Sequence, residues 1–221
     1  MIHIALGLSI FALAFQGAAQ TPTTPGAVNL KRIYALADKD IYRAVANLEA
    51  GGTQEMSADV VIKVTKLVDD KKANATLTVL NFKSTMDEGE APEAFDQVLD
   101  EHGMGDSFAD HGNQIVYTLC ELLAIVPGSS LKPGDDYSFN LHQTNGSVVG
   151  KGRFTDVKDL EGKKVAFLEW TCTITPPDGG EVSFKAKSQV DPLTGKVLKC
   201  EAELDPGRIS GKISIELKKP A

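Results

Sequence analysis

Recognised catalytic and cofactor-binding motifs are missing from this sequence. It has no Gly-x-Ser-x-Gly elbow, no phosphate-binding loop, no Gly-x-Gly-x-x-Gly turn and no Cys-x-x-Cys pair. These patterns mark hydrolases, nucleotide-binding folds and redox sites. Triad chemistry needs a histidine, and the sequence pairs none of His102, His111 and His142 with a Ser or Cys. We therefore expect a protein that is not an enzyme and that holds no cofactor.

Basic runs and aromatic residues are also scarce. The formal net charge is −7, and aromatic residues make up 6 % of the chain, with a single Trp. An acidic chain without a basic run repels phosphate backbones and anionic lipid surfaces. Few aromatic side chains also means few of the rigid anchors that dominate tight interfaces. We expect no nucleic-acid partner.

The N-terminal segment lacks charged residues altogether. Met1–Ala19 contains no Asp, Glu, Lys or Arg, and an apolar run over Ile4–Phe15 ends in the small-residue segment Gln16–Gln20. This pattern predicts a secretory signal peptide over residues 1–19, cleaved after Ala19. The run is shorter than the roughly 20 residues that span a bilayer. An uncleaved N-terminal anchor is the alternative.

Removal of the signal peptide predicts a periplasmic or secreted protein. No later stretch is long and apolar enough to cross a membrane, so we expect no integral membrane segment in the mature chain. Residues 20–29 are rich in Thr, Pro, Gly and Ala, which is typical of a disordered leader. Residues 30–221 are then expected to form a single β-rich domain.

Turn-forming residues recur at a steady interval in the C-terminal half, with β-favouring runs between them. Asn-Gly and related pairs accept the positive φ of tight hairpins, and short connections allow only antiparallel neighbours. The pattern therefore predicts an antiparallel meander. The turns are Asn145-Gly146, Glu161-Gly162, Asp178-Gly179-Gly180, Asp191-Pro192-Leu193-Thr194-Gly195 and Asp205-Pro206-Gly207.

The N-terminal half gives a weaker strand signal. Thr53–Val68 and Ala75–Lys83 are predicted strands. Residues 31–48 are ambiguous because their apolar side chains also fit helical spacing; we favour two strands that meet at Asp38-Lys39-Asp40. Leu36-x-x-x-Asp40-x-Tyr42 matches Leu131-x-x-x-Asp135-x-Tyr137. This match favours two repeated meander halves, about 30–85 and 130–218, although chance would also explain it.

A helical insert is expected between the halves, at about 91–126. Pro92 suits the first turn of a helix, Phe95, Val98 and Leu99 form an apolar stripe, and Gly103 ends the segment. A second short helix is predicted over Leu119–Val126. The predicted fold is mainly β: an antiparallel meander forming a curved sheet or half-barrel, with one or two short helices packed on it.

The cysteines leave two alternatives open. An exported chain can form disulfides, and the strand pattern turns both Cys172 and Cys200 toward the core from nearby strands. A disulfide between Cys172 and Cys200 is therefore one hypothesis. The other is that the three cysteines of the chain are buried free thiols that act as small apolar residues.

One polar cluster has the residue types of a metal site. Two histidines and several carboxylates lie within twelve residues, but their spacing fits no known binding loop. The preferred interpretation is a solvated helix end followed by an acidic turn, and we expect no metal. The cluster consists of Asp100, Glu101, His102, Asp106, Asp110 and His111.

Three turn-and-strand segments resemble those of uncharacterised secreted bacterial β domains. They are Leu131–Asp135, Leu160–Ala166 and Asp191–Val197. Similar hairpins occur in periplasmic lipoprotein-carrier-like half-barrels, in which a curved antiparallel sheet wraps a helix and can shelter an acyl chain. The resemblance covers roughly residues 130–204. It implies a fold rather than an activity, because its motifs are turn motifs.

Two functions fit these expectations. The first is an exported, non-catalytic domain with a structural or protein-interaction role in the cell envelope, its partner an unknown envelope protein. The alternative is a periplasmic carrier or sensor of a lipid or other apolar small molecule. The side chains proposed to line its ligand site would equally fill an ordinary core. They are Leu119, Leu122, Leu123, Phe167, Leu168 and Trp170.

Overall fold

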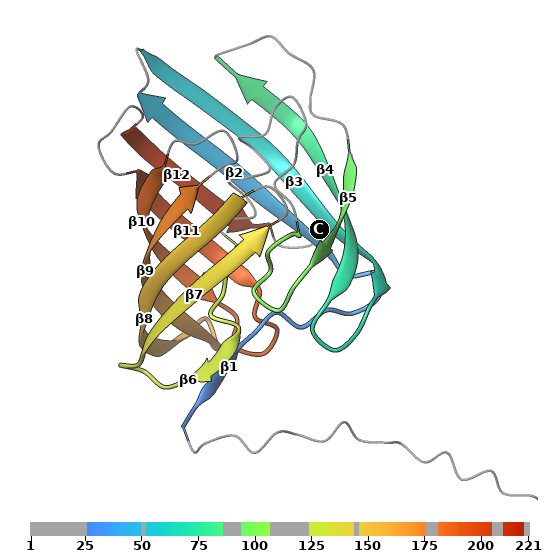
Figure 1. Cartoon of the computed structure of the whole chain (residues 1–221), viewed down its shortest axis with the longest axis vertical. Coiled ribbons are helices and arrows are strands. Elements are labelled where there is room, and N and C mark those ends of the chain that lie inside the picture. The colour runs from blue at the N-terminus through green and yellow to red at the C-terminus, as the bar shows by residue number, and fades with distance from the viewer. Residues whose placement is uncertain are drawn as a thin grey trace, which may run out of the picture.

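A computed structural model describes residues 26–49, 52–85, 94–106, 124–143, 146–175, 181–204 and 210–218, which form twelve β-strands and no helix (Figure 1). The predicted signal peptide lies outside these ranges. The strands are β1 Val28–Leu30, β2 Lys39–Glu49, β3 Thr53–Leu67, β4 Ala73–Ser84, β5 Phe95–Leu99, β6 Ser129–Leu131, β7 Asp136–Gln143, β8 Gly146–Leu160, β9 Lys163–Thr175, β10 Val182–Val190, β11 Val197–Leu204 and β12 Ser210–Leu217.

Ten of these strands form one antiparallel sheet. Its order is β5-β4-β3-β2-β12-β11-β10-β9-β8-β7, while β1 and β6 pair separately. The prediction of a mainly β, antiparallel fold is confirmed. Figure 1 shows the sheet curving between its two edge strands, β5 and β7. The predicted meander of the C-terminal half is confirmed as β7 to β12, each strand paired with the next.

The hairpin turns have the backbone that their residues favour. Glu161 and Gly162 have φ values of 54° and 77°, which is the geometry of a tight two-residue hairpin. In the turn between β10 and β11, Asp191 accepts a backbone hydrogen bond from Leu193 and a side-chain hydrogen bond from Thr194. Gly195 has φ 65° there, and a Cβ on it would lie 1.9 Å from the Lys31 carbonyl oxygen. This turn is therefore packed tightly against the segment that precedes β2.

The predicted helix from Pro92 to Gly103 is wrong. Phe95–Leu99 is β5, an edge strand that pairs with β4 in the register Ala73↔Leu99. Gln97 and Leu99 are buried at alternate positions, which is the period of a strand and not of a helix. Pro92 lies outside the described residues, as do 119–123 of the second predicted helix. Its last three residues, Ala124–Val126, are buried and not helical.

The ambiguous segment 31–48 is half strand and half irregular. β2 begins at Lys39, as the strand interpretation requires, but the residues from 31 to 38 form bends and a turn and not a first strand. Val28 and Asn29, expected in the disordered leader, belong to β1 and pair with β6. Leu30 at the end of β1 is fully buried, and this burial anchors the start of the domain.

The core lies against one face of the sheet. Alternation along each strand turns apolar side chains inward and charged ones outward. The largest fully buried side chains come from both halves of the chain and include Tyr42, Phe154, Leu168 and Ile215. They belong to one continuous apolar cluster. The two meanders therefore share a single core.

Strand β12 joins the two meanders. It pairs with β11 on one side and with β2 on the other, from Leu217↔Tyr42 to Ser210↔Glu49. Its inward residues Ile213 and Ile215 are 3 % and 0 % exposed. Strands that are distant in sequence thus meet on either side of one central strand.

We expect Ile215→Ala to lower the free energy of unfolding by about 2–5 kcal/mol, because it opens a cavity in a fully buried row of the core. Urea titration followed by tryptophan fluorescence measures the change. Ser214→Ala, on the outward face of the same strand, is the matched control, and we expect it to change stability by less than about 0.5 kcal/mol. Equal effects of the two substitutions would contradict the assignment of β12 to the core.

Candidate binding groove

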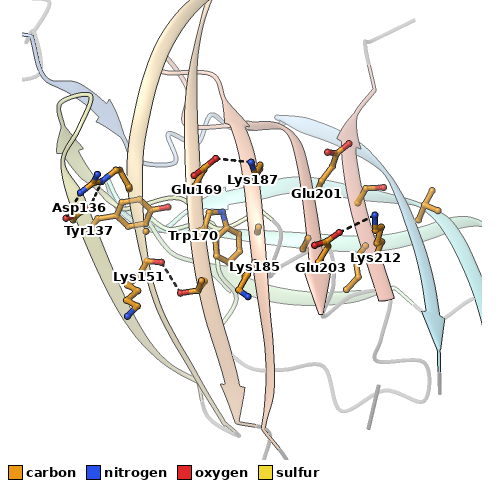
Figure 2. A pocket seen from close by; sticks show the side chains of 18 of the residues that line it. Asp136, Tyr137, Lys151, Glu169, Trp170, Lys185, Lys187, Glu201, Glu203 and Lys212 are labelled. Carbon is orange, nitrogen blue, oxygen red and sulfur yellow. Dashed lines mark hydrogen bonds and ion pairs between the residues drawn. The ribbon is translucent and has the colours of Figure 1, made fainter. Parts of the chain in front are cut away.

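A groove of about 1040 Å³ crosses the outward face of the sheet from β7 to β2 (Figure 2). We call it the outward groove. It runs across the strands, so each of seven adjacent strands contributes two or three residues. They are Val45, Asn47, Asp136, Tyr137, Lys151, Gly152, Arg153, Glu169, Trp170, Thr171, Lys185, Ala186, Lys187, Glu201, Ala202, Glu203, Lys212, Ile213 and Ser214.

Two rows of outward side chains form the walls. Strand register places each row in line across the sheet, because partners in neighbouring strands point to the same face. The first row is Asp136, Arg153, Glu169, Lys187, Glu201, Ser214 and Val45. The second row is Lys151, Thr171, Lys185, Glu203, Lys212 and Asn47.

The floor between the walls is the backbone of an inward row. Trp170, Ala186, Ala202 and Ile213 are each at most 4 % exposed, so their side chains point into the core beneath the groove. Ala186 and Ala202 are small residues at the centre of this row. The groove thus has a backbone floor and walls that carry charged side chains, while the side chains of Trp170, Ala186, Ala202 and Ile213 lie on the other side of the sheet.

Aromatic rings support the β7 end of the floor from below. Phe139 and Trp170 meet edge to face with ring centroids 6.0 Å apart, and Trp170 meets Phe184 in the same way at 5.4 Å. A Cβ on Gly150 would lie 2.1 Å from the Phe139 ring, and one on Gly152 would lie 2.6 Å from the Tyr137 ring. These two glycines let the rings of the edge strand fold over β8. Burial raises the pKa of Tyr137.

The charged walls pair with themselves across strands. Lys187 Nζ lies 3.0 Å from Glu169, Lys212 Nζ lies 3.2 Å from Glu203, and Arg153 Nε lies 2.7 Å from Asp136. All six side chains are more than half exposed. Exposed pairs of this kind contribute little to stability, because water screens the charges. A partner with complementary charges can therefore replace them with little loss of stability.

A buried carboxylate lies on the outward face two residues beyond the β2 end of the groove. Asp59 is 4 % exposed and accepts hydrogen bonds from Lys218 Nζ at 2.7 Å and Asn81 Nδ2 at 2.6 Å. Arg43 lies 3.5 Å away. Burial acts to raise the pKa of Asp59, but the Lys218, Asn81 and Arg43 contacts hold it below its ordinary value. This cluster ties the segment after β12 to β2, β3 and β4.

A second buried cluster of charged side chains lies at the end of the sheet where β2 begins. Asp40 accepts from Arg32 Nη2 at 2.9 Å and from Lys196 Nζ at 2.7 Å. Arg32 is 7 % exposed and stacks over the Tyr34 ring. Paired and buried charges of this kind are expensive to break singly. The cluster joins the segment before β2 to the turn between β10 and β11.

The disulfide predicted between Cys172 and Cys200 is not formed; both are buried free thiols. Strand β10 lies between them, and the two cysteines face Phe184 and Ser188 of that strand. Two strand spacings are about 9–10 Å, beyond the roughly 7 Å between Cα atoms that a disulfide tolerates. Sequence alternation gave the correct face but could not give the strand register.

The described residues proposed to line an apolar ligand site lie on both faces of β9. Leu168 and Trp170 are core residues, 1 % and 4 % exposed. The indole Nε1 of Trp170 donates to Ser188 Oγ at 2.8 Å. Phe167 points to the opposite face, where Lys158 Nζ lies 5.2 Å from its ring centroid. Leu119, Leu122 and Leu123 lie outside the described residues.

The described members of the acidic and histidine cluster have structural partners. Asp100 Oδ1 accepts from the backbone N–H groups of His102 and Met104 at 2.9 and 3.0 Å. His102 Nδ1 lies 3.0 Å from the Val126 carbonyl oxygen. Within the described ranges no three His, Cys, Asp or Glu residues are grouped to hold a metal ion. Asp110 and His111 lie outside those ranges.

No family model and no curated protein matches the chain. Solved structures that are similar to it include the following two. One is a Bacteroides fragilis protein described as exported and as having a YmcC-like fold: 12 % identity, covering 86 % of this chain and 100 % of that chain, TM-score 0.43. The other is the hypothetical lipoprotein YmcC from Escherichia coli: 17 % identity, covering 86 % and 91 %, TM-score 0.29.

None of the described segments is a helix with the length and hydropathy needed to cross a membrane.

Acid should destabilise the protein through Asp59. A carboxylate with a lowered folded-state pKa contributes stability above its unfolded pKa of about 3.9 and loses that contribution as the pH falls through the folded pKa. We expect Asp59→Asn to lose roughly 1 kcal/mol at neutral pH, since its partners are partly exposed. We also expect a flatter dependence of stability on pH below about 5.

Urea titrations across this pH range test the prediction. Asp70→Asn, in the exposed turn between β3 and β4, is the control and should keep the acid dependence of the parent. The same acid dependence in Asp59→Asn and in the parent would show that the Asp59 cluster does not link stability to pH.

Proposed function

We propose that this protein is an exported, non-catalytic domain that binds a protein partner in the cell envelope through the outward groove. The observation that supports the proposal is the composition of the groove walls. Five cationic and four acidic side chains alternate across them, within a chain of net charge −7. A surface of mixed charge fits a partner with a complementary charge pattern, which gives specificity and orientation more than raw affinity.

The charged side chains of the groove walls favour a protein over an apolar ligand. The walls carry exposed charges and the floor is backbone, whereas sites for small apolar molecules are lined mainly by hydrophobic side chains. The lining proposed for a lipid is divided between the two faces of β9, with Leu168 and Trp170 inward and Phe167 outward. These placements support protein interaction as the role, with transport of an apolar ligand the less favoured alternative.

A photo-cross-linking amino acid at Thr171, within the groove, tests the proposal in cells that make the protein. We expect one protein adduct at Thr171 and none at Glu55, an exposed position of β3 that does not line the groove. Reversing two wall charges, Lys187→Glu with Lys212→Glu, should abolish the adduct because it puts like charges against the partner. The folded state should survive, since the ion pairs lost are exposed.

The matched control reverses the same charge elsewhere. Lys63→Glu with Lys83→Glu changes the net charge equally at exposed positions outside the groove, and we expect it to keep the adduct. An adduct that is insensitive to the groove reversal would reject the groove as the binding surface. A stoichiometric lipid found by native mass spectrometry, without an adduct, would favour the carrier.

A further inference from the structure

Within the described residues, the edge strand β7 has one hydrogen-bonding edge without a partner strand. It ends the ten-stranded sheet and pairs only with β8, in an unbroken register from Asp136↔Arg153 to Gln143↔Gly146. No hydrogen bond reaches its other edge from the described part of the chain. Natural sheets protect such edges with Pro, Lys, bulges or a covering segment. β7 has no Pro, no Lys and no bulge.

The opposite edge is different. β5 has five residues, against eight in β7. Leu99 at its end also forms a bridge with Gly105. Short strands and covering segments are two of the devices that keep an edge from pairing with another chain. The comparison singles out β7 as the edge that is open to strand addition.

The hydrogen-bond pattern shows which backbone groups of β7 are free. Phe154 N–H donates to the Asp135 carbonyl at 2.9 Å, so Asp136↔Arg153 is a non-hydrogen-bonded pair of the antiparallel ladder. Such pairs alternate with hydrogen-bonded ones along the strand. The residues whose N–H and C=O groups point away from β8 are therefore Asp136, Ser138, Asn140 and His142. All four side chains are exposed on the outward face.

We propose that β7 pairs with β7 of a second copy of this chain, antiparallel and about a two-fold axis at Phe139. This register engages all four free residues, because Asp136 then faces the second copy's His142 and Ser138 faces its Asn140. Every other symmetric register leaves at least one of the four unpaired. The positions of the unpaired backbone N–H and C=O groups therefore favour this one register, in which β7 is complementary to a second β7.

The side chains on both faces suit this pairing. On the outward face an acid meets a histidine and a hydroxyl meets an amide, which are favourable cross-strand pairs. On the inward face Tyr137 meets the second copy's Leu141, and the two Phe139 positions face each other at the axis. Phe139 is already fixed against Trp170, so the edge enters the pair with a rigid apolar face.

The product is one continuous sheet across two copies. Because the two-fold axis is perpendicular to the sheet, both outward faces lie on the same side. A single strand-to-strand contact is smaller than the roughly 1,200 Å² of a stable interface. The dimer should therefore form and dissociate with protein concentration, and this inference does not rest on the function proposed for the groove.

Sedimentation of the protein under reducing conditions, over a range of concentrations, tests the proposal. We expect a monomer–dimer equilibrium in the parent and only monomer in Asn140→Pro. Proline removes an N–H that β8 does not use, so the β7–β8 ladder stays intact. Asn140→Thr keeps the N–H and a strand-favouring side chain, and should still dimerise. A parent that is monomeric at every concentration, or a dimer that persists in Asn140→Pro, overturns the proposal.

Hydrogen exchange gives an independent measurement. The amides of Ser138, Asn140 and His142 should exchange freely at low concentration and become protected at high concentration. If Asn140→Pro does not fold, the double variant Ser138→Arg with Asn140→Arg replaces it, because it sets like charges opposite each other across the axis. Unchanged dimerisation in that variant, or exchange that is independent of concentration, also overturns the proposal.

Discussion

The two meanders form one continuous sheet because β12 pairs with a strand on each side, β2 and β11. Its partners, β2 and β11, end 161 and 6 residues before β12 begins, and eight residues of β12 are in register with β2. Closing so long a loop costs conformational entropy before any contact forms. The buried row that includes Ile215 offsets this cost. Without β12, the chain would be two meanders, each with an unpaired edge and half a core.

The outward groove follows from the same strand order. Its walls are straight rows because neighbouring strands are in register, and the rows extend from β7 to β2 only because β12 bridges the middle. The strands bury one face completely, so their other face is free to carry charge without weakening the core. The features that specify the fold and those that would specify a partner therefore lie on opposite faces of the same strands.

Local turn chemistry was the part of the fold that the sequence predicted best. Glu161-Gly162 and the Asp191–Gly195 turn adopt the conformations that their residues favour, and the C-terminal meander follows from them. The prediction of a helix at 92–103 was wrong because three apolar residues in a short segment also fit a helical stripe. In the structure, pairing with β4 gives this segment the alternation of a strand. A five-residue edge strand is too short for its period to be recognised.

The groove could not be predicted, since it depends on which strands are neighbours. The sequence feature that corresponds to the groove is a charged residue at every second position of neighbouring strands: Lys185 and Lys187, Glu201 and Glu203, and Lys212. Each strand alone shows only that one face is solvated. The choice between the two cysteine hypotheses could not be made for the same reason: β10 separates Cys172 from Cys200 although both point inward, and they are the buried free thiols of the second hypothesis.

Those two thiols have a consequence for the maturation of the protein. Burial raises the pKa of each to about 12, so the reactive thiolate is almost absent from the folded state. An unfolded chain would expose the same thiols at their ordinary pKa to the oxidants of the compartment that the N-terminal segment predicts. In that predicted compartment, folding and oxidation would compete for the unfolded chain. In the folded protein Cys172 and Cys200 are unreactive, so rapid folding protects them from oxidation.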